Sequence, residues 1–435
     1  MSYLQYNDYY RKLILSGQMP FPPYYLQTHV APNIVNENCE ECYQVNWPIV
    51  AYPYAFGENH EIYNLCYTPK DRCLATNDYC SYYCAPFNDP SNVMAFRIVP
   101  LVSNISCECP DPNLLNPWNS IIINDIVWVT SAGTGLITQY NLLGARIPCT
   151  LSAKQQVIPG ASIPSITINV FDSNNNLAQP TGIVCNPNLQ AFLLYSGPNV
   201  YSSTVIVATR NGTINGYNPD LDACNSIVVV DNCKKNCVYT GLELVCGVLY
   251  ATDFYNKKID VFDYNFKQID CSEKYQFLDE CSDIMPNDFA PYNIVNIGEY
   301  LYVLYAKQNA RDNQYECIGR GEGYINIFTF EGKFVRRFIS RGVLNVPYGI
   351  ILAPELFGYP AGAIIVGNFG DGILNVFTFE GVWLGCMSDA CGISLSIQGL
   401  RGLRRSCYCR NLFYWCSSTN NLSNAFVGTV NTKPC

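Results

Sequence analysis

Histidine, the commonest general base, is nearly absent from this chain of 435 residues. Its two histidines are His29 and His60. No imidazole after residue 60 can therefore act as a base or bind zinc, which excludes Ser-His-Asp, Cys-His and His-zinc chemistry from most of the chain. The remaining reactive groups are cysteine thiols and the carboxylate and amide oxygens, which suit a hard cation such as calcium.

Cysteine is the reactive residue type in excess, with 23 copies. Many lie in close pairs or short runs and are our disulfide candidates: Cys39, Cys42, Cys66, Cys73, Cys80, Cys84, Cys107, Cys109, Cys233, Cys237, Cys271, Cys281, Cys386, Cys391, Cys407 and Cys409. The run that starts with Cys39 and Cys42 is also compatible with zinc, but no second CxxC follows at zinc-ribbon distance. Scattered disulfides are the favoured interpretation, and the odd total leaves at least one thiol free or bonded to another chain.

Disulfides in this number predict an oxidising environment. The first twelve residues contain no basic segment followed by an apolar one, so no signal peptide is visible. No apolar stretch is long enough to predict a membrane span. A large cytoplasmic DNA virus, which supplies its own thiol oxidase, offers oxidation without secretion, and the abundant Asn, Tyr and Ile fit an AT-rich genome. We therefore expect a virion or an extracellular surface.

The balance of charge narrows the class of partner. Lys and Arg number 26 against 35 Asp and Glu, which gives a formal net charge of −9. Such a chain lacks the basic surface of a general nucleic-acid binder, so no nucleic acid is expected as a partner. Only 14% of residues are charged, whereas 49% are hydrophobic, which predicts a folded chain with a substantial core.

A six-fold repeat indicates which elements position these groups. In each unit a turn residue is followed by a small residue and an aliphatic one. The six copies are Pro117–Ile121, Pro180–Ile183, Tyr239–Leu242, Pro291–Ile294, Pro347–Ile350 and Leu400–Leu403. Their central Asn or Gly residues, at 119, 182, 241, 293, 349 and 402, mark the expected blade starts at spacings of 52 to 63 residues.

Each motif precedes short strands separated by polar turns. An apolar strand such as Ile126–Val129 comes first, and an alternating strand such as Leu136–Tyr140 follows. Four short strands in each of six units predict an all-β, six-bladed β-propeller over residues 96–435. Residues 1–95, rich in Cys and Tyr and without periodicity, are expected to form an irregular N-terminal arm. Closure of the ring protects strand edges, so few charges suffice for solubility.

Several stretches within this repeat resemble a known family. They are Asp111–Trp118, Ala290–Gly298, Leu301–Gln308 and Val366–Gly372. Over roughly residues 100–430 the chain is similar to a family of uncharacterised, mostly bacterial, exported proteins with an NHL-type six-bladed propeller. The resemblance implies the fold and no established activity. The long arm, the missing leader and the added cysteines depart from that family, and they predict a giant-virus version of it.

In such propellers, the loops that lead into the inner strands and the loops between the second and third strands meet on one face, around the central channel. The polar residues expected there are Asn119, Arg210, Asp253, Asn293, Lys307, Asn368, Asp371 and Arg401. Asn119, Asp253, Asn293 and Asn368 form a candidate ligand or calcium set. Lys307 and Arg210 would repel a cation. The alternative is that Asn and Gly are there because tight turns need their backbone freedom.

These observations leave three functions open. The leading one is a non-enzymatic structural or interaction protein, stabilised by disulfides, without a cofactor, whose partners are other proteins, itself, or virion or fibre components. The second is a calcium-dependent hydrolase or lyase with its site in the channel. The third is a glycan-binding propeller.

Overall fold

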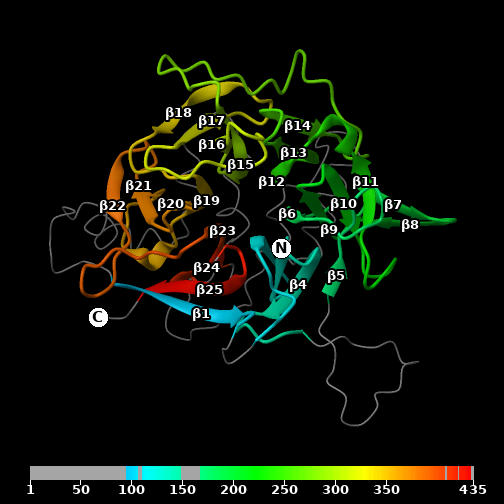
Figure 1. The fold of residues 1–435 in the computed structure, drawn as a ribbon, viewed down its shortest axis with the longest axis horizontal. Coiled ribbons are helices and arrows are strands. Elements are labelled where there is room, and N and C mark those ends of the chain that lie inside the picture. The colour runs from blue at the N-terminus through cyan, green and yellow to red at the C-terminus, as the bar shows by residue number, and fades with distance from the viewer. Residues whose placement is uncertain (1–94, 106–109, 148–166, 407–408, 420, 433–435) are drawn as a thin grey trace, which may run out of the picture.

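The structure is a computed structural model that describes residues 95–105, 110–147, 167–406, 409–419 and 421–432. Six antiparallel sheets surround a common centre, which confirms the predicted six-bladed β-propeller (Figure 1). The expected N-terminal arm lies outside the described residues, as do the cysteines from Cys39 to Cys84.

The first three blades run from the inner strand outwards in chain order. Blade 1 consists of β2 (Pro117–Ile123), β3 (Ile126–Ser131), β4 (Leu136–Asn141) and β5 (Thr167–Asn169). Blade 2 consists of β6 (Pro180–Cys185), β9 (Val205–Thr209), β10 (Thr213–Tyr217) and β11 (Ile227–Asp231), with a hairpin of β7 (Leu193–Ser196) and β8 (Asn199–Ser202) inserted. A 3-10 turn, η6 (Cys233–Lys235), leads into blade 3, which consists of β12 (Tyr239–Val245), β13 (Val248–Asp253) and β14 (Lys258–Phe262).

The remaining blades keep four strands each. Blade 4 consists of β15 (Phe289–Ile297), β16 (Tyr300–Lys307), β17 (Gly323–Phe328) and β18 (Phe334–Ser340). Blade 5 consists of β19 (Pro347–Leu352), β20 (Ile364–Asn368), β21 (Leu374–Phe377) and β22 (Trp383–Cys386), with the 3-10 turn η7 (Glu355–Phe357) between its first two strands. Blade 6 consists of β23 (Leu400–Arg405), β24 (Leu412–Thr419), β25 (Asn424–Thr432) and β1 (Phe96–Ser103).

Blade 3 departs from the expected four strands. Its third strand is followed only by an isolated bridge between Phe262 and Gln268. The chain then runs through a long loop, which contains Cys271 and Cys281, before it reaches β15. One pair of main-chain partners does not make a ladder, so blade 3 ends at β14 with a single bridge beyond it.

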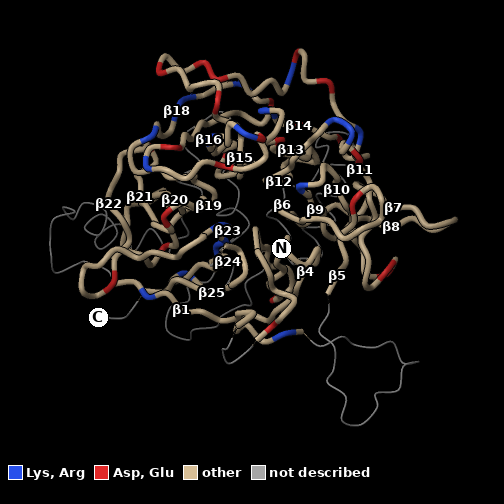
Figure 2. Tube along the Cα trace, in the orientation of Figure 1, with Lys and Arg blue, Asp and Glu red and all other residues tan. Residues whose placement is uncertain are grey.

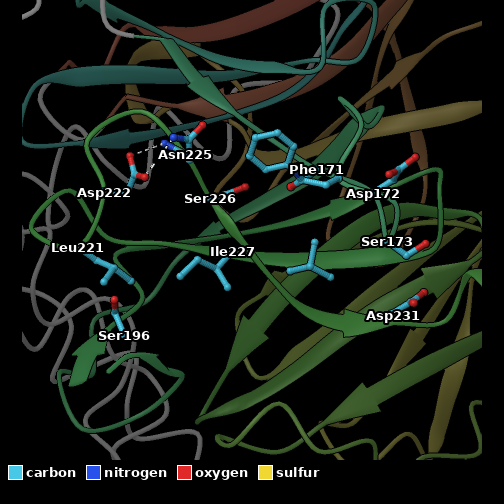
Figure 3. A pocket seen from close by; sticks show the side chains of 12 residues that line it. Phe171, Asp172, Ser173, Ser196, Leu221, Asp222, Asn225, Ser226, Ile227 and Asp231 are labelled. Atoms are coloured by element: carbon cyan, nitrogen blue, oxygen red, sulfur yellow. Dashed lines mark hydrogen bonds between the residues drawn. The ribbon is translucent and has the colours of Figure 1, made fainter. Parts of the chain in front are cut away.

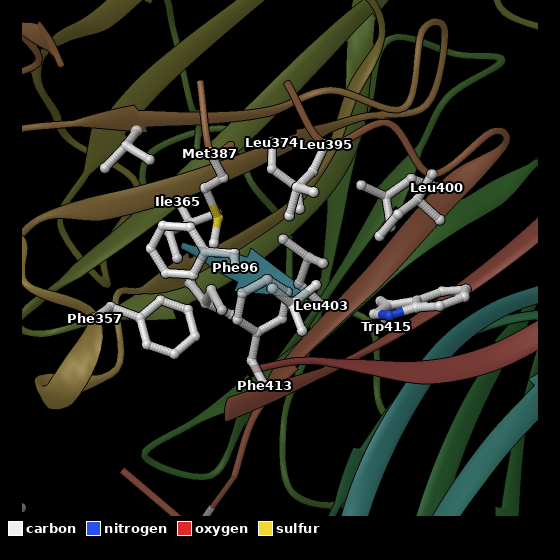
Figure 4. Close-up of a cluster of buried hydrophobic side chains, with 14 of the residues drawn as sticks. Phe96, Phe357, Ile365, Leu374, Met387, Leu395, Leu400, Leu403, Phe413 and Trp415 are labelled. Carbon is white, nitrogen blue, oxygen red and sulfur yellow. The ribbon is translucent and has the colours of Figure 1, made fainter. Parts of the chain in front are cut away.

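Blade 6 closes the ring because it combines both ends of the described chain. Strand β1 pairs antiparallel with β25, from Phe96 opposite Thr432 to Ser103 opposite Phe426 (Figure 1). Phe96 then inserts into the apolar core between blades 5 and 6, where its ring lies 5.1 Å from that of Phe357 (Figure 4). Burial of a phenylalanine contributes about 1.5–3 kcal/mol, so this residue holds the closing strand in place.

The central Asn or Gly of each motif lies inside an inner strand rather than in a turn. A β-bulge accompanies it in every blade, for example between Pro180 and Ile183. Gly182 has an ordinary φ, and a Cβ there would lie 2.5 Å from the main-chain nitrogen of Leu242 in the next blade. The turn interpretation is therefore wrong for these positions. Small residues are needed because adjacent inner strands approach closely around the axis.

The outer surface mixes both signs of charge. Figure 2 shows Lys and Arg interspersed with Asp and Glu along the outer loops and strands. Within the described part of the chain, the structure contains no helix with the length and apolar character needed to cross a bilayer.

Candidate functional site

The predicted face of the propeller carries a cavity of about 720 Å³ at the mouth of the central channel. Loops that lead into inner strands and loops between second and third strands line it, so segments far apart in the sequence meet there. The lining residues are Asn116, Trp118, Gln179, Arg210, Tyr315, Glu316, Ile318, Phe369, Gly370, Asp371, Ser396, Gln398, Gly399, Arg401, Ser418, Thr419, Asn421 and Leu422. We call this the channel-mouth cavity.

Aromatic rings form a cluster at the centre of the propeller beneath this cavity. Trp118 makes edge-to-face contacts with Tyr292 and Tyr348, at centroid distances of 6.0 and 5.6 Å. Phe254 packs on Tyr292 at 5.1 Å, and Phe369 belongs to the same buried cluster. Rings in this arrangement attract one another beyond their apolar burial. Trp118 and Phe369 line the channel-mouth cavity, and the other rings pack beneath them.

Three of these rings occupy the same position in the repeat, the residue before the central Asn or Gly. From blade 1 to blade 6, the residues at this position are Trp118, Thr181, Thr240, Tyr292, Tyr348 and Arg401. The alternation of the inner strand directs it towards the axis, whereas the neighbouring Asn or Gly abuts the next blade. The repeat alignment contained this signal, but sequence reasoning considered the central residue and missed Trp118.

Arg401 is the most unusual side chain of the cavity. Only 2% of it is exposed, and its guanidinium lies 4.0 Å from the ring centroid of Trp118 and 4.3 Å from that of Phe369. Its Nη1 donates to Asn116 Oδ1 at 2.6 Å, while its buried Nε has no partner in the described parts of the chain. Among the described residues it forms no salt bridge. Within the described residues this buried guanidinium thus has stacking partners but no ion-pair partner.

Arg210 brings a second guanidinium to the same indole. It lies 5.5 Å from the Trp118 ring centroid and 4.5 Å from that of Tyr315. Its Nη2 donates to the main-chain oxygen of Gln314 at 2.8 Å. Gln314 and Tyr315 belong to the loop between β16 and β17 of blade 4, so this loop reaches the second-to-third strand loop of blade 2. The contact fixes one wall of the cavity.

Two carboxylates also line the cavity, and they differ in their hydrogen bonds. Asp371 accepts from the main-chain nitrogen of Ile373 at 3.0 Å and from Asn345 Nδ2 at 3.1 Å. Glu316 has a buried Oε2 without a partner among the described residues. Burial, and then the charge of Glu316, raise the pKa of the Tyr292 hydroxyl well above its ordinary value. That hydroxyl is also buried without a partner, so it stays neutral and is able to donate.

The four residues of the predicted calcium set do not line the cavity. Asn293 donates from Nδ2 to Tyr348 O at 2.8 Å and accepts the main-chain N–H of Ile294 at 2.9 Å, so its amide joins two blades. Asn119 accepts the N–H of Ser120 at 2.9 Å. Asn368 donates to Val343 O at 2.8 Å, which leaves its buried Oδ1 without a partner. These amides are engaged mainly with the main chain.

Asp253, the fourth residue of that set, belongs to a buried cluster in blade 3. Ligand atoms of Cys237, Asp253 and Asp260 lie within 4.8 Å of one another, a geometry compatible with a metal ion. However, Lys258 Nζ lies 2.5 Å from Asp260 Oδ1 and 3.9 Å from Asp253 Oδ2. Burial alone would lower the pKa of Lys258, but the bond and charge of Asp260, with Asp253, raise it above its ordinary value. The ammonium therefore supplies the positive charge of this cluster.

The other polar residues expected at the channel separate into two groups. Arg210, Asp371 and Arg401 line the channel-mouth cavity. Lys307 does not, because its Nζ pairs with Glu322 Oε1 at 3.2 Å and with Asp288 Oδ2 at 3.7 Å.

The cysteines of the described residues are all thiols. The expected pairs Cys233/Cys237, Cys271/Cys281 and Cys386/Cys391 are not bonded, and Cys409 is also free. The sulfurs have other partners: Cys237 Sγ lies 3.8 Å from Asp260 Oδ2, and Cys386 Sγ lies 3.6 Å from Asn375 Oδ1. Cys107, Cys109 and Cys407 lie outside the described residues.

A second cavity, of about 730 Å³, lies at the outer side of blade 2 and includes Asp172, Asp222 and Asp231 (Figure 3). Its carboxylates are engaged within their own loops. Asp222 Oδ2, for instance, accepts from Asn225 Nδ2 at 3.0 Å, and Asp172 Oδ1 accepts two main-chain N–H groups. These bonds are the usual turn chemistry of aspartate, so this cavity offers few free ligand atoms.

The fold and the cavity define a six-bladed propeller with an arginine- and aromatic-lined channel mouth. The chain belongs to a family of uncharacterized proteins of Acanthamoeba polyphaga mimivirus. It is 34% identical to protein L690 over 79% of this chain and 88% of that protein, and 35% identical to protein R648 over 79% and 82%. It is 42% identical to protein R640 over 76% of this chain and spans 58% of R640's length. No family model matches the chain.

Solved structures resemble the chain more distantly. The virginiamycin B lyase of Staphylococcus aureus matches with a TM-score of 0.44 and 13% identity over 77% of this chain and 99% of that one. A protein of unknown function from Bacteroides thetaiotaomicron matches with a TM-score of 0.47 and 9% identity over 77% and 76%. The function of this chain does not follow from either. The sequence relatives are viral, which agrees with a giant-virus protein and gives no support to a bacterial exported family.

Proposed function

We propose that this protein is a non-enzymatic interaction protein of a virus particle or its surface, in which a rigid propeller binds a ligand at the channel mouth. One observation carries the proposal: the polar groups of the channel-mouth cavity are arranged for recognition. Arg401 is held between Trp118 and Phe369, and Arg210 between Trp118 and Tyr315. Stacked arginines present fixed donors to a ligand.

The catalytic alternative finds less support in the same geometry. A calcium-dependent hydrolase or lyase would need the oxygens of Asn119, Asp253, Asn293 and Asn368 to converge on one ion. The amides of Asn293 and Asn119 are bonded to the main chain, and Asp253 lies beside the ammonium of Lys258. Each of these contacts would have to be broken before a cation could bind.

The viral relatives support a viral setting, and the 23 cysteines of the full chain are compatible with an oxidising compartment. Disulfides, a virion location and association with itself or with virion or fibre proteins accordingly belong to this proposal. The cysteines outside the described residues are the candidates for such bonds.

Two measurements test the proposal. Purified particles should contain the protein, and non-reducing peptide mass spectrometry on that material should identify its disulfides and any covalent partner. Calcium should leave the Tm of the purified protein unchanged. A calcium-dependent rise in Tm that Asp253→Asn abolishes would instead favour the enzyme, and absence from particles would contradict the virion role.

A further inference from the structure

We propose that the channel-mouth cavity binds a carbohydrate that carries a carboxylate, such as one containing a uronic acid unit, and that Arg401 binds the carboxylate. The inference rests on the proposed function, because it names the ligand class of the same cavity.

An anionic ligand would stabilise the buried charge of Arg401. A guanidinium remains protonated at any physiological pH, and a buried charge without a counter-ion is strongly unfavourable. Arg401 is 2% exposed, and within the described chain its polar contact is the neutral amide oxygen of Asn116. Its buried Nε has no partner among the residues that the structure describes. A ligand carboxylate would supply both the missing charge and the missing acceptor.

A second guanidinium, that of Arg210, and a second hydrogen-bond donor, the indole Nε1 of Trp118, lie beside Arg401. The guanidinium of Arg210 lies over the same indole ring as that of Arg401. The indole itself is 1% exposed, and its Nε1 has no partner among the described residues. Two guanidinium groups and an indole N–H thus lie together in a cavity whose lining also carries the carboxylates of Glu316 and Asp371. The acceptor that they lack is expected to come from the ligand.

The rest of the cavity suits hydroxyl groups better than a polyanion. Amides and hydroxyls surround the arginines: Asn116, Gln179, Gln398 and Asn421, with Ser396, Ser418 and Thr419. Glu316 adds a buried carboxylate oxygen that no described residue contacts with a hydrogen bond. A sugar hydroxyl both donates and accepts, so it is able to satisfy amides and a carboxylate together. Glu316 and Asp371 would repel a peptide or nucleic acid with several negative charges.

Size and shape agree with a short saccharide. The volume of about 720 Å³ lies within the range of about 300–1,000 Å³ that is usual for small-molecule sites. The buried rings lie beneath the two guanidinium groups, so a sugar ring would contact the arginines, the exposed Tyr315 and the polar rim. Tyr315, which is 49% exposed, lines the cavity with its ring centroid 4.5 Å from the guanidinium of Arg210, and it would contact the ligand.

Isothermal titration calorimetry with a glucuronate-containing tetrasaccharide tests this inference on the full chain. The matched control is the same tetrasaccharide after reduction of its carboxylates to alcohols. We expect the acidic sugar to bind at least about ten-fold more tightly, because a charge-assisted hydrogen bond has roughly that effect. Equal binding of the reduced sugar, no binding of the acidic sugar, or equal binding of a Glu-rich hexapeptide would overturn the assignment.

Variants locate the binding in this cavity. Arg401→Met keeps the length and apolar stem of the side chain, and it should weaken binding by about ten-fold or more. Arg210→Met should weaken it in the same direction and serves as the second variant if Arg401→Met does not fold. Arg311→Met removes an exposed arginine from the loop that carries Tyr315, outside the cavity, and should bind like the wild type. If both cavity variants fold and bind normally, the inference fails.

The outcomes separate this inference from the proposed function. If the acidic sugar does not bind but the protein is still found in particles, only the ligand class is wrong. If the sugar binds and the protein is absent from particles, the virion role is wrong and the ligand class stands.

Discussion

The close approach of inner strands predicts a large effect of a single methyl group at Gly182. A Cβ built there would lie 2.5 Å from Leu242 N and 2.8 Å from Gly241 C, both main-chain atoms of blade 3. A main-chain atom cannot rotate away as a side chain can, so β6 and β12 would have to separate. That movement would also stretch the hydrogen bond from Thr181 Oγ1 to Tyr239 O, which measures 2.9 Å.

The expected cost follows from these terms. Overpacking costs about 1–3 kcal/mol, and the weakened hydrogen bond costs about 1 kcal/mol. Alanine recovers about 0.4–1 kcal/mol by restricting the unfolded chain. We therefore expect Gly182→Ala to lower the free energy of unfolding by about 2 kcal/mol, as measured by equilibrium denaturation followed by tryptophan fluorescence.

Gly319→Ala is the matched control for this measurement. A Cβ there would meet only side-chain atoms of Glu322, the nearest at 3.0 Å, and Gly319 lies in a loop. Its effect should remain within about 0.5 kcal/mol. If Gly182→Ala is as stable as Gly319→Ala, the strands do not constrain the position, and the explanation of the repeat by close approach is refuted.

Three further predictions concern the blade 3 cluster and the ring closure. Lys258→Met should destabilise the fold by about 1–2 kcal/mol, because it leaves buried carboxylates without a cation at a partly exposed site; denaturation should show partial recovery when Asp260→Asn is added. Burial, followed by the bond and charge of Asp253, raises the pKa of Cys237 to about 12 from an ordinary 9.0. Cys237 should thus resist iodoacetamide at pH 8.5 while exposed Cys391 reacts, as peptide mass spectrometry would show. Its contribution to stability should be complete below pH 9 and be lost as pH rises towards 12. Phe96→Ala should cost about 3–5 kcal/mol, and limited proteolysis should cleave β1 first; equal resistance of the variant would contradict the closing role of Phe96.

The residues at the centre of the propeller could have been predicted from the sequence by comparing the six repeats one position earlier. The repeat alignment places Trp118, Tyr292, Tyr348 and Arg401 at one position of the unit, and alternation in the inner strand directs that position to the axis. The adjacent Asn residues were the predicted ligands instead, since amide oxygens are known cation ligands. The residue types were correct for a ligand, but their side chains are engaged with the main chain.

The contacts of the cysteines and the end of blade 3 could not be predicted from neighbouring residues in the sequence. The expected pairs of cysteines follow sequence proximity, whereas the sulfur of Cys237 lies near Asp260 through the pairing of strands. Likewise, the fourth strand of blade 3 was expected from the repeat, and only the path of the long loop before β15 reduces it to one bridge at Gln268.

The architecture follows from the sequence alone, because six copies of one motif at similar spacing, each with alternating strands, are compatible with few folds other than a closed ring of blades. The sequence also excluded histidine chemistry from the propeller. Arg210, Asp371 and Arg401 were expected at the channel face from the sequence, but the stacking of Arg401 on Trp118 follows only from the folded structure. Arg401 meets Trp118 because closure of the ring through β1 and β25 brings the last blade against the first. Contacts between the two ends of a chain depend on the geometry of the whole ring, and no local pattern of residues encodes them.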